Sequence, residues 1–337
     1  MSKINMKEWV AEITKSKKVA AIPIMTHPGI EMIGRSVEEA CKSGKIHSEA
    51  IIALNKSFDA AASTVIMDLT VEAEAFGAEI NFTKHEVPSV VGRALACYDD
   101  VAALEIPSLN KGRLQEYILA NKLSAEAITD KPVFAGAIGP YSLAGRLYDM
   151  TEIMMAIYIE PDTVKLLLDK CTTFLINYIT ALKESGIGGV VIAEPASGLL
   201  SGHDCATYSS TYVKKIVDAL QDDYFTVILH NCGNTGHCTD AMLQSGAAAY
   251  HFGNKIDMAD ALAKIESNFM VMGNIDPVGV MQQMSHIDVY KETSSLLERC
   301  GTYPNFVIST GCDTPPLVPK ENIVAFYKAV SDYNNKI

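Results

Sequence analysis

Eight short, apolar stretches rich in β-branched residues alternate along this chain with amphipathic patterns of helical length. Strands that are apolar on both faces belong in a parallel sheet covered by helices. Eight such units in series favour a closed (β/α)8 TIM barrel of the α/β class, with an open doubly wound sheet as the alternative. The expected strands are 19–25, 63–69, 133–138, 189–193, 225–230, 247–252, 269–272 and 306–309.

The chain shows no sign of a division into separate domains. No Pro-rich or Gly/Ser-rich linker interrupts its 337 residues, and (β/α)8 barrels commonly reach this length as one unit. We therefore expect a single barrel domain over residues 1–337. Within it, residues 1–18 are expected to form a leading amphipathic helix, and residues 98–130 a helical insertion between the second and third strands.

Composition and charge exclude several classes of protein. A net charge of −12 argues against a nucleic-acid-binding surface, which needs concentrated Lys and Arg. The N-terminal residues lack the apolar core of a signal peptide, and no apolar run reaches the roughly 18 residues of a membrane span. We expect a cytoplasmic protein without nucleic-acid or membrane partners. Its eight cysteines should then be reduced thiols, some of them free to bind a metal.

One His and two Cys follow strands of the expected barrel, where the active sites of barrel enzymes lie. His230 and Cys232 come at the end of the fifth strand, two positions apart and thus on the same face. Cys312 follows the eighth strand. One imidazole and two thiolates suit zinc, and three protein ligands leave the open position typical of a catalytic site. The alternative is a buried His bonded to a backbone carbonyl, with two unrelated thiols.

This ligand set favours one kind of chemistry. Zinc bound by two thiolates and a neutral imidazole has a formal charge near zero, so it lowers the pKa of a bound substrate thiol while leaving the sulfur electron-rich. The site therefore favours the transfer of an activated methyl group to a thiolate. Hydrolysis is less favoured, because zinc hydrolases mostly use His and carboxylate ligands.

Other polar residues at or just past strand ends are candidates for a supporting role. Asp68, Glu194 and Asp276 are expected to hydrogen-bond to a ligating His or to the substrate. Asp276 precedes a proline, and we favour a turn or helix cap for it. His27 follows the first strand and is a candidate for the substrate pocket, although a Pro-Gly turn explains its motif almost as well. Glu72 is expected on a solvated helix face.

Short motifs are spread along nearly the whole chain: Thr26-His27-Pro28-Gly29, Met67-Asp68-Leu69-Thr70, Gly139-Pro140-Tyr141-Ser142, Glu194-Pro195-Ala196-Ser197, Gly273-Asn274-Ile275-Asp276-Pro277 and Gly311-Cys312. With these motifs the chain resembles the uroporphyrinogen decarboxylase superfamily, and within it the corrinoid-dependent methyltransferases typified by methylcobalamin:coenzyme M methyltransferase. In that branch a His-x-Cys pair and a Cys about 80 residues further on bind zinc; here Cys312 lies 80 positions after Cys232. The resemblance therefore implies His230, Cys232 and Cys312 as zinc ligands.

The resemblance also implies an activity and a partner. A zinc-dependent methyltransferase of this kind takes a methyl group from a methylcobamide and passes it to a small thiol such as coenzyme M, and cobalt leaves as Co(I). Tetrahydrofolate is an alternative acceptor. The chain contains no Asp-x-His-x-x-Gly sequence, the usual corrinoid-binding signature. The cobamide is therefore expected on a methylated corrinoid protein that docks transiently.

Departures from the family pattern define the rival functions. Decarboxylases carry an Arg-rich stretch after the first strand that binds a polycarboxylate tetrapyrrole, whereas this chain has only five Arg in total. Cys312 also replaces their usual His. A tetrapyrrole decarboxylase is thus the first rival, and a non-catalytic metal- or corrinoid-binding module the second. Some coenzyme M methyltransferases use a Glu after the sixth strand as an exchangeable fourth zinc ligand; here His251 is the candidate for that role.

Overall fold

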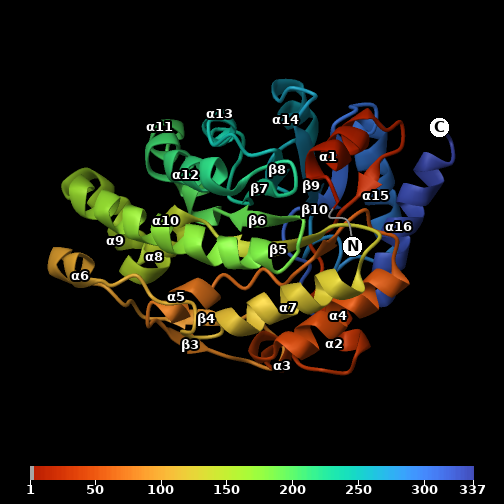
Figure 1. Cartoon of the computed structure of the whole chain (residues 1–337). Coiled ribbons are helices and arrows are strands. Elements are labelled where there is room, and N and C mark those ends of the chain that lie inside the picture. The colour runs from red at the N-terminus through yellow and green to blue at the C-terminus, as the bar shows by residue number, and fades with distance from the viewer. Residues whose placement is uncertain (1–3) are drawn as a thin grey trace.

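A computed structural model describes residues 4–337 and shows a curled sheet of eight parallel strands with helices around it (Figure 1). The strands are hydrogen-bonded in the order β1-β10-β9-β8-β7-β6-β5-β2. This arrangement confirms the (β/α)8 TIM barrel expected from the sequence. The strands are β1 (Ala20–Ala21), β2 (Ser63–Thr64), β5 (Val133–Ile138), β6 (Gly189–Ala193), β7 (Thr226–Asn231), β8 (Ala249–Phe252), β9 (Met270–Ile275) and β10 (Phe306–Thr310).

The helices surround the sheet and fill the connections between strands. They are α1 (Met6–Lys15), α2 (His27–Met32), α3 (Val37–Lys42), α4 (Gly44–Ser57), α5 (Val71–Ala75), α6 (Tyr98–Ala103), α7 (Leu114–Ala127), α8 (Pro140–Tyr148), α9 (Met150–Ile159), α10 (Pro161–Glu184), α11 (Gly202–Cys205), α12 (Thr211–Leu220), α13 (Thr239–Leu243), α14 (Met258–Lys264), α15 (His286–Cys300) and α16 (Lys320–Asn334), with a 3₁₀ turn η1 (Pro195–Leu199) and a π turn η2 (Ala206–Ser210).

The barrel closes between β1 and β2, which are both much shorter than the expected strands 19–25 and 63–69. Pro23 has no N–H to donate to a ladder, so regular pairing after β1 stops early. Isolated hydrogen bonds join the segments after β1 and β2 instead. Met25 N donates to Thr64 Oγ1 at 3.0 Å, and Thr26 Oγ1 donates to the Thr64 carbonyl at 3.1 Å. Two bonds that involve threonine side chains, together with one from the Ala61 N–H to the Ala21 carbonyl at 2.9 Å, therefore bridge this seam of the barrel.

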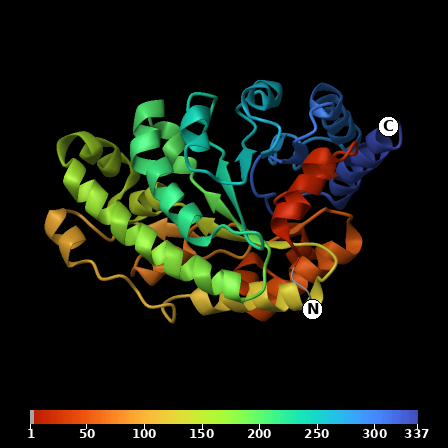
Figure 2. The same cartoon turned by 45° about the horizontal axis from the view of Figure 1, so that its top comes forward.

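Helices lie within both the expected leading segment and the expected insertion. Residues 1–3 of the expected helix lie outside the described residues, and α1 begins after Asn5, whose side chain accepts the Glu8 N–H at 3.0 Å. Figures 1 and 2 place α1 close to the C-terminal helices α15 and α16. Residues 98–130 contain α6 and α7. A hairpin of β3 (Glu79–Asn81) and β4 (Ser89–Val91) precedes them and was not predicted, because three-residue strands carry too little alternation to recognise.

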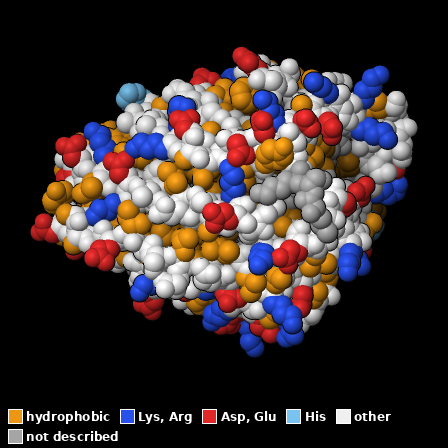
Figure 3. Space-filling model, viewed as in Figure 1, with side chains coloured by type: hydrophobic (Ala, Val, Ile, Leu, Met, Phe, Trp, Pro, Cys, Tyr) orange, Lys and Arg blue, Asp and Glu red, His pale blue; other side chains and the backbone are white. Residues whose placement is uncertain are grey.

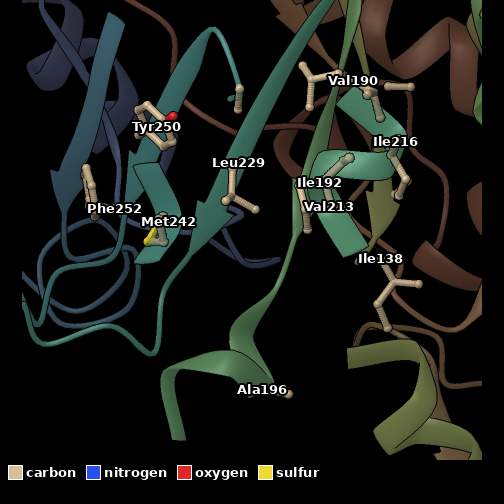
Figure 4. Packing of buried hydrophobic residues seen from close by; sticks show 14 of the residues in the cluster. Ile138, Val190, Ile192, Ala196, Val213, Ile216, Leu229, Met242, Tyr250 and Phe252 are labelled. Atoms are coloured by element: carbon tan, nitrogen blue, oxygen red, sulfur yellow. The ribbon is translucent and has the colours of Figure 1, made fainter. Parts of the chain in front are cut away.

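The strands alternate between the barrel interior and the outer layer. Ile228, Ala249 and Val307 belong to the interior cluster, which Met6 and Val10 of α1 also join. Their neighbours along the strands pack outward against helices; Figure 4 shows Leu229 and Tyr250 of this outer layer. Side chains two positions apart share a face. His230, His251 and Ser309, two residues after Ile228, Ala249 and Val307, therefore face the interior at the carboxyl ends of their strands.

The surface viewed in Figure 3 carries acidic and basic side chains that are interspersed rather than separated into single-sign stripes. Within residues 4–337, none of the helices is long and apolar enough to cross a membrane.

Candidate metal centre

The structure brings His230, Cys232 and Cys312 together at the carboxyl end of the barrel. One ligand atom from each residue lies within 4.8 Å of the other two. His230 lies on the interior face of β7, one residue before the strand ends. Cys232 follows that strand, and Cys312 comes two residues after β10. The imidazole is buried and the two thiols are half-buried. Residues 80 positions apart therefore meet because the strands that carry them belong to one curled sheet.

Two glycines allow these loops to approach each other. A Cβ on Gly253, after β8, would lie only 2.6 Å from the Cys232 Cα. A Cβ on Gly311 would lie 2.7 Å from the Asn254 backbone nitrogen. Only residues without a Cβ permit such contacts between backbones. The loops after β7, β8 and β10 thus pack directly on one another, which sets the positions of the two cysteines.

Hydrogen bonds hold the loop that carries Cys232. Asn231 Nδ2 donates to Ser197 Oγ at 2.9 Å, and Asn231 Oδ1 accepts the Gly233 N–H at 3.0 Å. Ser197 Oγ in turn donates to the Glu194 carbonyl at 2.9 Å. The residue between the two ligands therefore ties their loop to η1.

The loop of Cys312 is tied to the start of the chain. The Thr314 N–H donates to the Ile24 carbonyl at 2.8 Å. Asp313 Oδ2 accepts the Met67 N–H at 3.3 Å and lies 3.5 Å from His27 Nδ1. Asp313 thus contacts the segments after β1 and β2 and fixes the position of the candidate ligand Cys312 across the barrel seam. Its position directly after Cys312 was the one indication of this role in the sequence.

The hydrogen bonds around His230 assign its tautomer. Ser309 Oγ donates to the Thr310 carbonyl at 3.0 Å, so it accepts a hydrogen bond from His251 Nε2 at 2.9 Å. Burial, and then the neighbouring His230, lower the pKa of His251 well below 6.5, so this ring is neutral and carries its one proton on Nε2. His251 Nδ1 must then accept from His230 Nδ1, 2.7 Å away. Because His230 Nδ1 donates this hydrogen bond, the ring nitrogen left for a metal is Nε2.

That nitrogen is the atom a metal would use. Among the described residues, His230 Nε2 is buried and has no hydrogen-bond partner. Buried polar atoms are nearly always paired, so an unpaired imidazole lone pair beside two thiols matches a metal ligand set. The carboxylate-free set of one nitrogen and two sulfurs fits zinc.

His251 contacts its neighbours through both ring nitrogens, one with His230 and one with Ser309. In this arrangement His251 orients His230, and its role as an exchangeable fourth ligand stays a prediction. The register between β7 and β8 pairs the Cα atoms of these two histidines directly, which explains the contact.

The two thiols share a hydrogen bond that makes one of them more acidic. Donation from Cys312 lowers the pKa of Cys232 to about 7, and burial opposes this shift. The same bond raises the pKa of Cys312, which holds the shared proton. Cys232 is thus the first thiol of the pair to ionise and to become available as a thiolate ligand.

Glu194 acts on the neighbouring helix rather than on the three candidate ligands. Its carboxylate accepts the N–H groups of Tyr141 and Ser142 at 2.8 Å and 3.3 Å, at the start of α8. Gly139 makes room for it, since a Cβ there would overlap the Glu194 carboxylate. Burial raises the pKa of Glu194 to about 8 although these donors oppose the shift. The Glu194 N–H also donates to the His230 carbonyl at 2.8 Å, which links α8 to β7.

Asp68 is buried in an ion pair with Arg113. Arg113 donates to its Oδ2, and Tyr117 Oη donates to the same oxygen at 2.8 Å. Thr70 Oγ1 donates to Oδ1 at 2.6 Å. The Arg113 Nε also pairs with Glu74 Oε2 at 2.6 Å. Arg113 precedes α7 in the insertion, and nothing in the sequence indicated that it pairs with a residue 45 positions away.

The remaining candidates lie in a turn and in the protein interior. Asp276 Oδ1 accepts the Val278 and Gly279 N–H groups at 2.9 Å and 2.8 Å, as the favoured turn interpretation predicted. His27 is buried, its Nδ1 lies 3.0 Å from the Thr314 carbonyl, and its Nε2 has no partner among the described residues. The expectation of a solvated Glu72 was wrong, since this side chain is only 1% exposed.

Glu72 is buried because neighbouring helices cover its side of the one-turn helix α5. α7 and α8 both pack against it. Glu72 Oε1 accepts the Ile138 N–H at 3.0 Å, whereas Oε2 has no partner within the described residues. Burial raises the pKa of Glu72 to about 7, so this carboxyl group titrates near neutrality.

Comparison with known proteins identifies the family. The model of the uroporphyrinogen decarboxylase (URO-D) family matches residues 7–333. The chain belongs to the uroporphyrinogen decarboxylase family. A methylcobamide:CoM methyltransferase of Methanosarcina mazei is 29% identical over 273 residues, covering 80% of this chain and 79% of the relative. A uroporphyrinogen decarboxylase of Vibrio vulnificus is 27% identical over 303 residues, covering 87% and 84%.

Solved structures share the fold. A methyltransferase from Methanosarcina mazei superposes with a TM-score of 0.87 at 24% identity, over 98% of this chain and 99% of the other. A B12-independent methionine synthase from Shewanella superposes with a TM-score of 0.58 at 12% identity, over 96% and 97%. Both comparisons agree with the (β/α)8 barrel.

Proposed function

We propose that this chain is a zinc-dependent methyltransferase that moves a methyl group from a methylated corrinoid protein to a small thiol such as coenzyme M. The observation that carries the proposal is the unpaired, buried Nε2 of His230 beside the thiols of Cys232 and Cys312. The similarity to methylcobamide:CoM methyltransferases of two Methanosarcina species, each 29% identical, supports the same conclusion.

His230, Cys232 and Cys312 would hold the metal. When bound, zinc would supply an open coordination position at which an acceptor thiol ionises near neutral pH. His251 accepts the hydrogen bond of His230 Nδ1 and so leaves His230 Nε2 for the metal. The lowered pKa of Cys232 makes a thiolate available at neutral pH. Asn231 and Asp313 hold the two cysteine loops in place.

The transfer itself is a displacement at carbon. The acceptor sulfur forms a bond to the methyl carbon, the methyl–cobalt bond of the donor breaks, and its electron pair stays on cobalt. The chain must therefore admit the donor at the carboxyl end of the barrel, where the loops after β7 and β10 lie. A transiently docking corrinoid protein meets this need, because the methyl group must be presented from outside the barrel.

The arginines argue against the decarboxylase alternative. Arg35, Arg113 and Arg299 are already paired with Glu39, with Asp68 and Glu74, and with Asp257. Only two of the five arginines are left to bind a substrate with many carboxylates. The half-buried thiol of Cys312, which takes the place of the decarboxylases' His, suits metal binding better than tetrapyrrole decarboxylation.

Metal analysis combined with a transfer assay tests the proposal. We expect the protein purified without added metal to contain about one zinc per chain and to demethylate methylcobalamin in the presence of coenzyme M, followed by absorbance. The Cys312→Ala variant should lose most of the zinc and all transfer, with an unchanged circular dichroism spectrum. The exposed Cys97 provides the control, since Cys97→Ala should keep both. Full transfer by folded Cys312→Ala would contradict the proposed site.

A further inference from the structure

Cys232 and Cys312 are free thiols that lie close to each other at the carboxyl end of the barrel. Their Sγ atoms are no more than 4.8 Å apart, and both residues are partly exposed to solvent. A disulfide bond needs the two sulfurs at about 2.0 Å. Rotation about the Cα–Cβ bonds of two cysteines can close a gap of this size. The two thiols are therefore placed to react with each other as well as to bind a metal.

The other six cysteines are less suited to such a reaction. Among residues 4–337, five of them are buried and Cys97 is exposed. Cys238 belongs to the same loop as the candidate ligand after β7, but its side chain is fully buried. Its Sγ donates to the carbonyls of Ser197 and Leu200 at 3.5 Å and 3.7 Å. The pair of thiols at the candidate metal centre therefore combines proximity with exposure.

The backbone next to each of these two thiols is held in place. Asn231 ties the loop of Cys232 to η1. Asp313, next to Cys312, accepts the Met67 N–H at 3.3 Å. The thiols therefore stay near each other, and a reagent bound covalently to one of them is displaced by the other within the same molecule. This displacement is faster than reaction with a second reagent molecule, since it needs no further encounter.

We propose that Cys232 and Cys312 are a modification site at which a low-molecular-weight disulfide converts the two thiols into a disulfide bond. The thiolate of one cysteine attacks a sulfur of the reagent, and the first reagent thiolate leaves with the electron pair of the broken S–S bond. The second cysteine then attacks the first and displaces the other reagent thiolate. The protons of the two cysteines end on the two released thiols, so one disulfide is reduced for each one formed.

This modification goes beyond the proposed function and does not require methyl transfer. A disulfide removes two of the three candidate metal ligands, because cysteine binds metals as the thiolate. The disulfide form of an acceptor thiol is itself a low-molecular-weight disulfide. The ratio of thiol to disulfide around the protein therefore sets the fraction of chains that can hold a metal. Excess thiol reverses the exchange and restores both ligands.

Disulfide mapping on the metal-free, full-length protein tests the inference. The reduced protein is treated with 2-hydroxyethyl disulfide near neutral pH, the remaining thiols are alkylated, and tryptic peptides are analysed by mass spectrometry. We expect two peptides joined through Cys232 and Cys312, with two hydrogen atoms lost, and a mixed disulfide on the exposed Cys97. In Cys232→Ser a mixed disulfide should persist on Cys312, because the thiol that displaces it has been removed. Cys97→Ala is the control and should form the same bond as the wild type.

The outcomes separate this inference from the proposed function. Alkylation of both Cys232 and Cys312 while Cys97 reacts fully would overturn the inference, and so would a stable mixed disulfide on each of them. If circular dichroism shows that Cys232→Ser is unfolded, the wild type and Cys97→Ala decide. Zinc at about ten times its Kd should slow the reaction by about tenfold, since only the metal-free protein reacts.

The zinc dependence and the transfer assay distinguish the two proposals. Equal rates of disulfide formation with and without zinc would contradict the proposed metal centre and leave the disulfide standing. Methyl transfer by a protein whose two thiols stay reduced under the reagent would overturn the inference alone.

Discussion

Replacement of Gly253 by alanine tests whether backbone packing sets the geometry of the metal centre. The new Cβ would lie 2.6 Å from both the Cα and the carbonyl oxygen of Cys232, whereas ordinary contacts begin at 3.4 Å. The Cys232 backbone must therefore move by about 0.8 Å, because neither neighbour is a flexible side chain. Metal sites tolerate errors of only about 0.2 Å in ligand distance. We expect zinc affinity to fall by at least about tenfold.

The assay is competition for zinc against a chromophoric chelator, together with urea unfolding. Overpacking should cost about 1–3 kcal/mol of stability, so Gly253→Ala should remain folded at 25 °C. Gly145→Ala is the matched control: its Cβ meets the flexible end of Met150, which can move aside, and zinc affinity should stay at the wild-type value. Wild-type zinc affinity in Gly253→Ala would refute the argument that this contact positions Cys232.

Two further predictions concern buried titratable residues. His251→Phe removes the acceptor that directs His230 Nε2 toward the thiols, so zinc affinity should fall by about 10- to 100-fold in a chelator competition; unchanged affinity would contradict the orienting role. Glu72→Gln tests the pKa of about 7, raised from 4.5. Because the folded state holds this proton more tightly, wild-type stability should fall relative to Glu72→Gln by about 3 kcal/mol between pH 4.5 and pH 8. Equal pH profiles in urea unfolding would refute the burial argument.

The sequence predicted the barrel best where strands are long and fully buried. The expected strands 133–138 and 189–193 coincide with β5 and β6, since apolar, β-rich runs bounded by turns leave little choice. β1 and β2 are shorter than expected because isolated hydrogen bonds rather than a ladder bridge the seam next to Pro23. Such bridges depend on distant residues and have no local pattern.

The candidate site could be predicted only in part, for a similar reason. His230 and Cys232 stand out because a strand end places them on one face. The orienting role of His251 depends instead on the register between β7 and β8, which one sequence does not reveal. The pairing of Arg113 with Asp68 and the burial of Glu72 likewise depend on how the insertion covers α5. Sequence patterns identify residues at an edge of the sheet, whereas their partners follow from tertiary packing.

The bonds from Asp313 and Thr314 to the first strands have a consequence for biosynthesis. A nascent chain can bury its early strands while the ribosome is still adding residues, but Cys312 is translated 80 residues after Cys232. Until then the first segments lack the contacts that Asp313 and Thr314 provide. If the three side chains of the candidate metal centre hold an ion, as we propose, its capture would have to await translation of the segment that carries Cys312, so metal uptake would come late in the folding of the barrel.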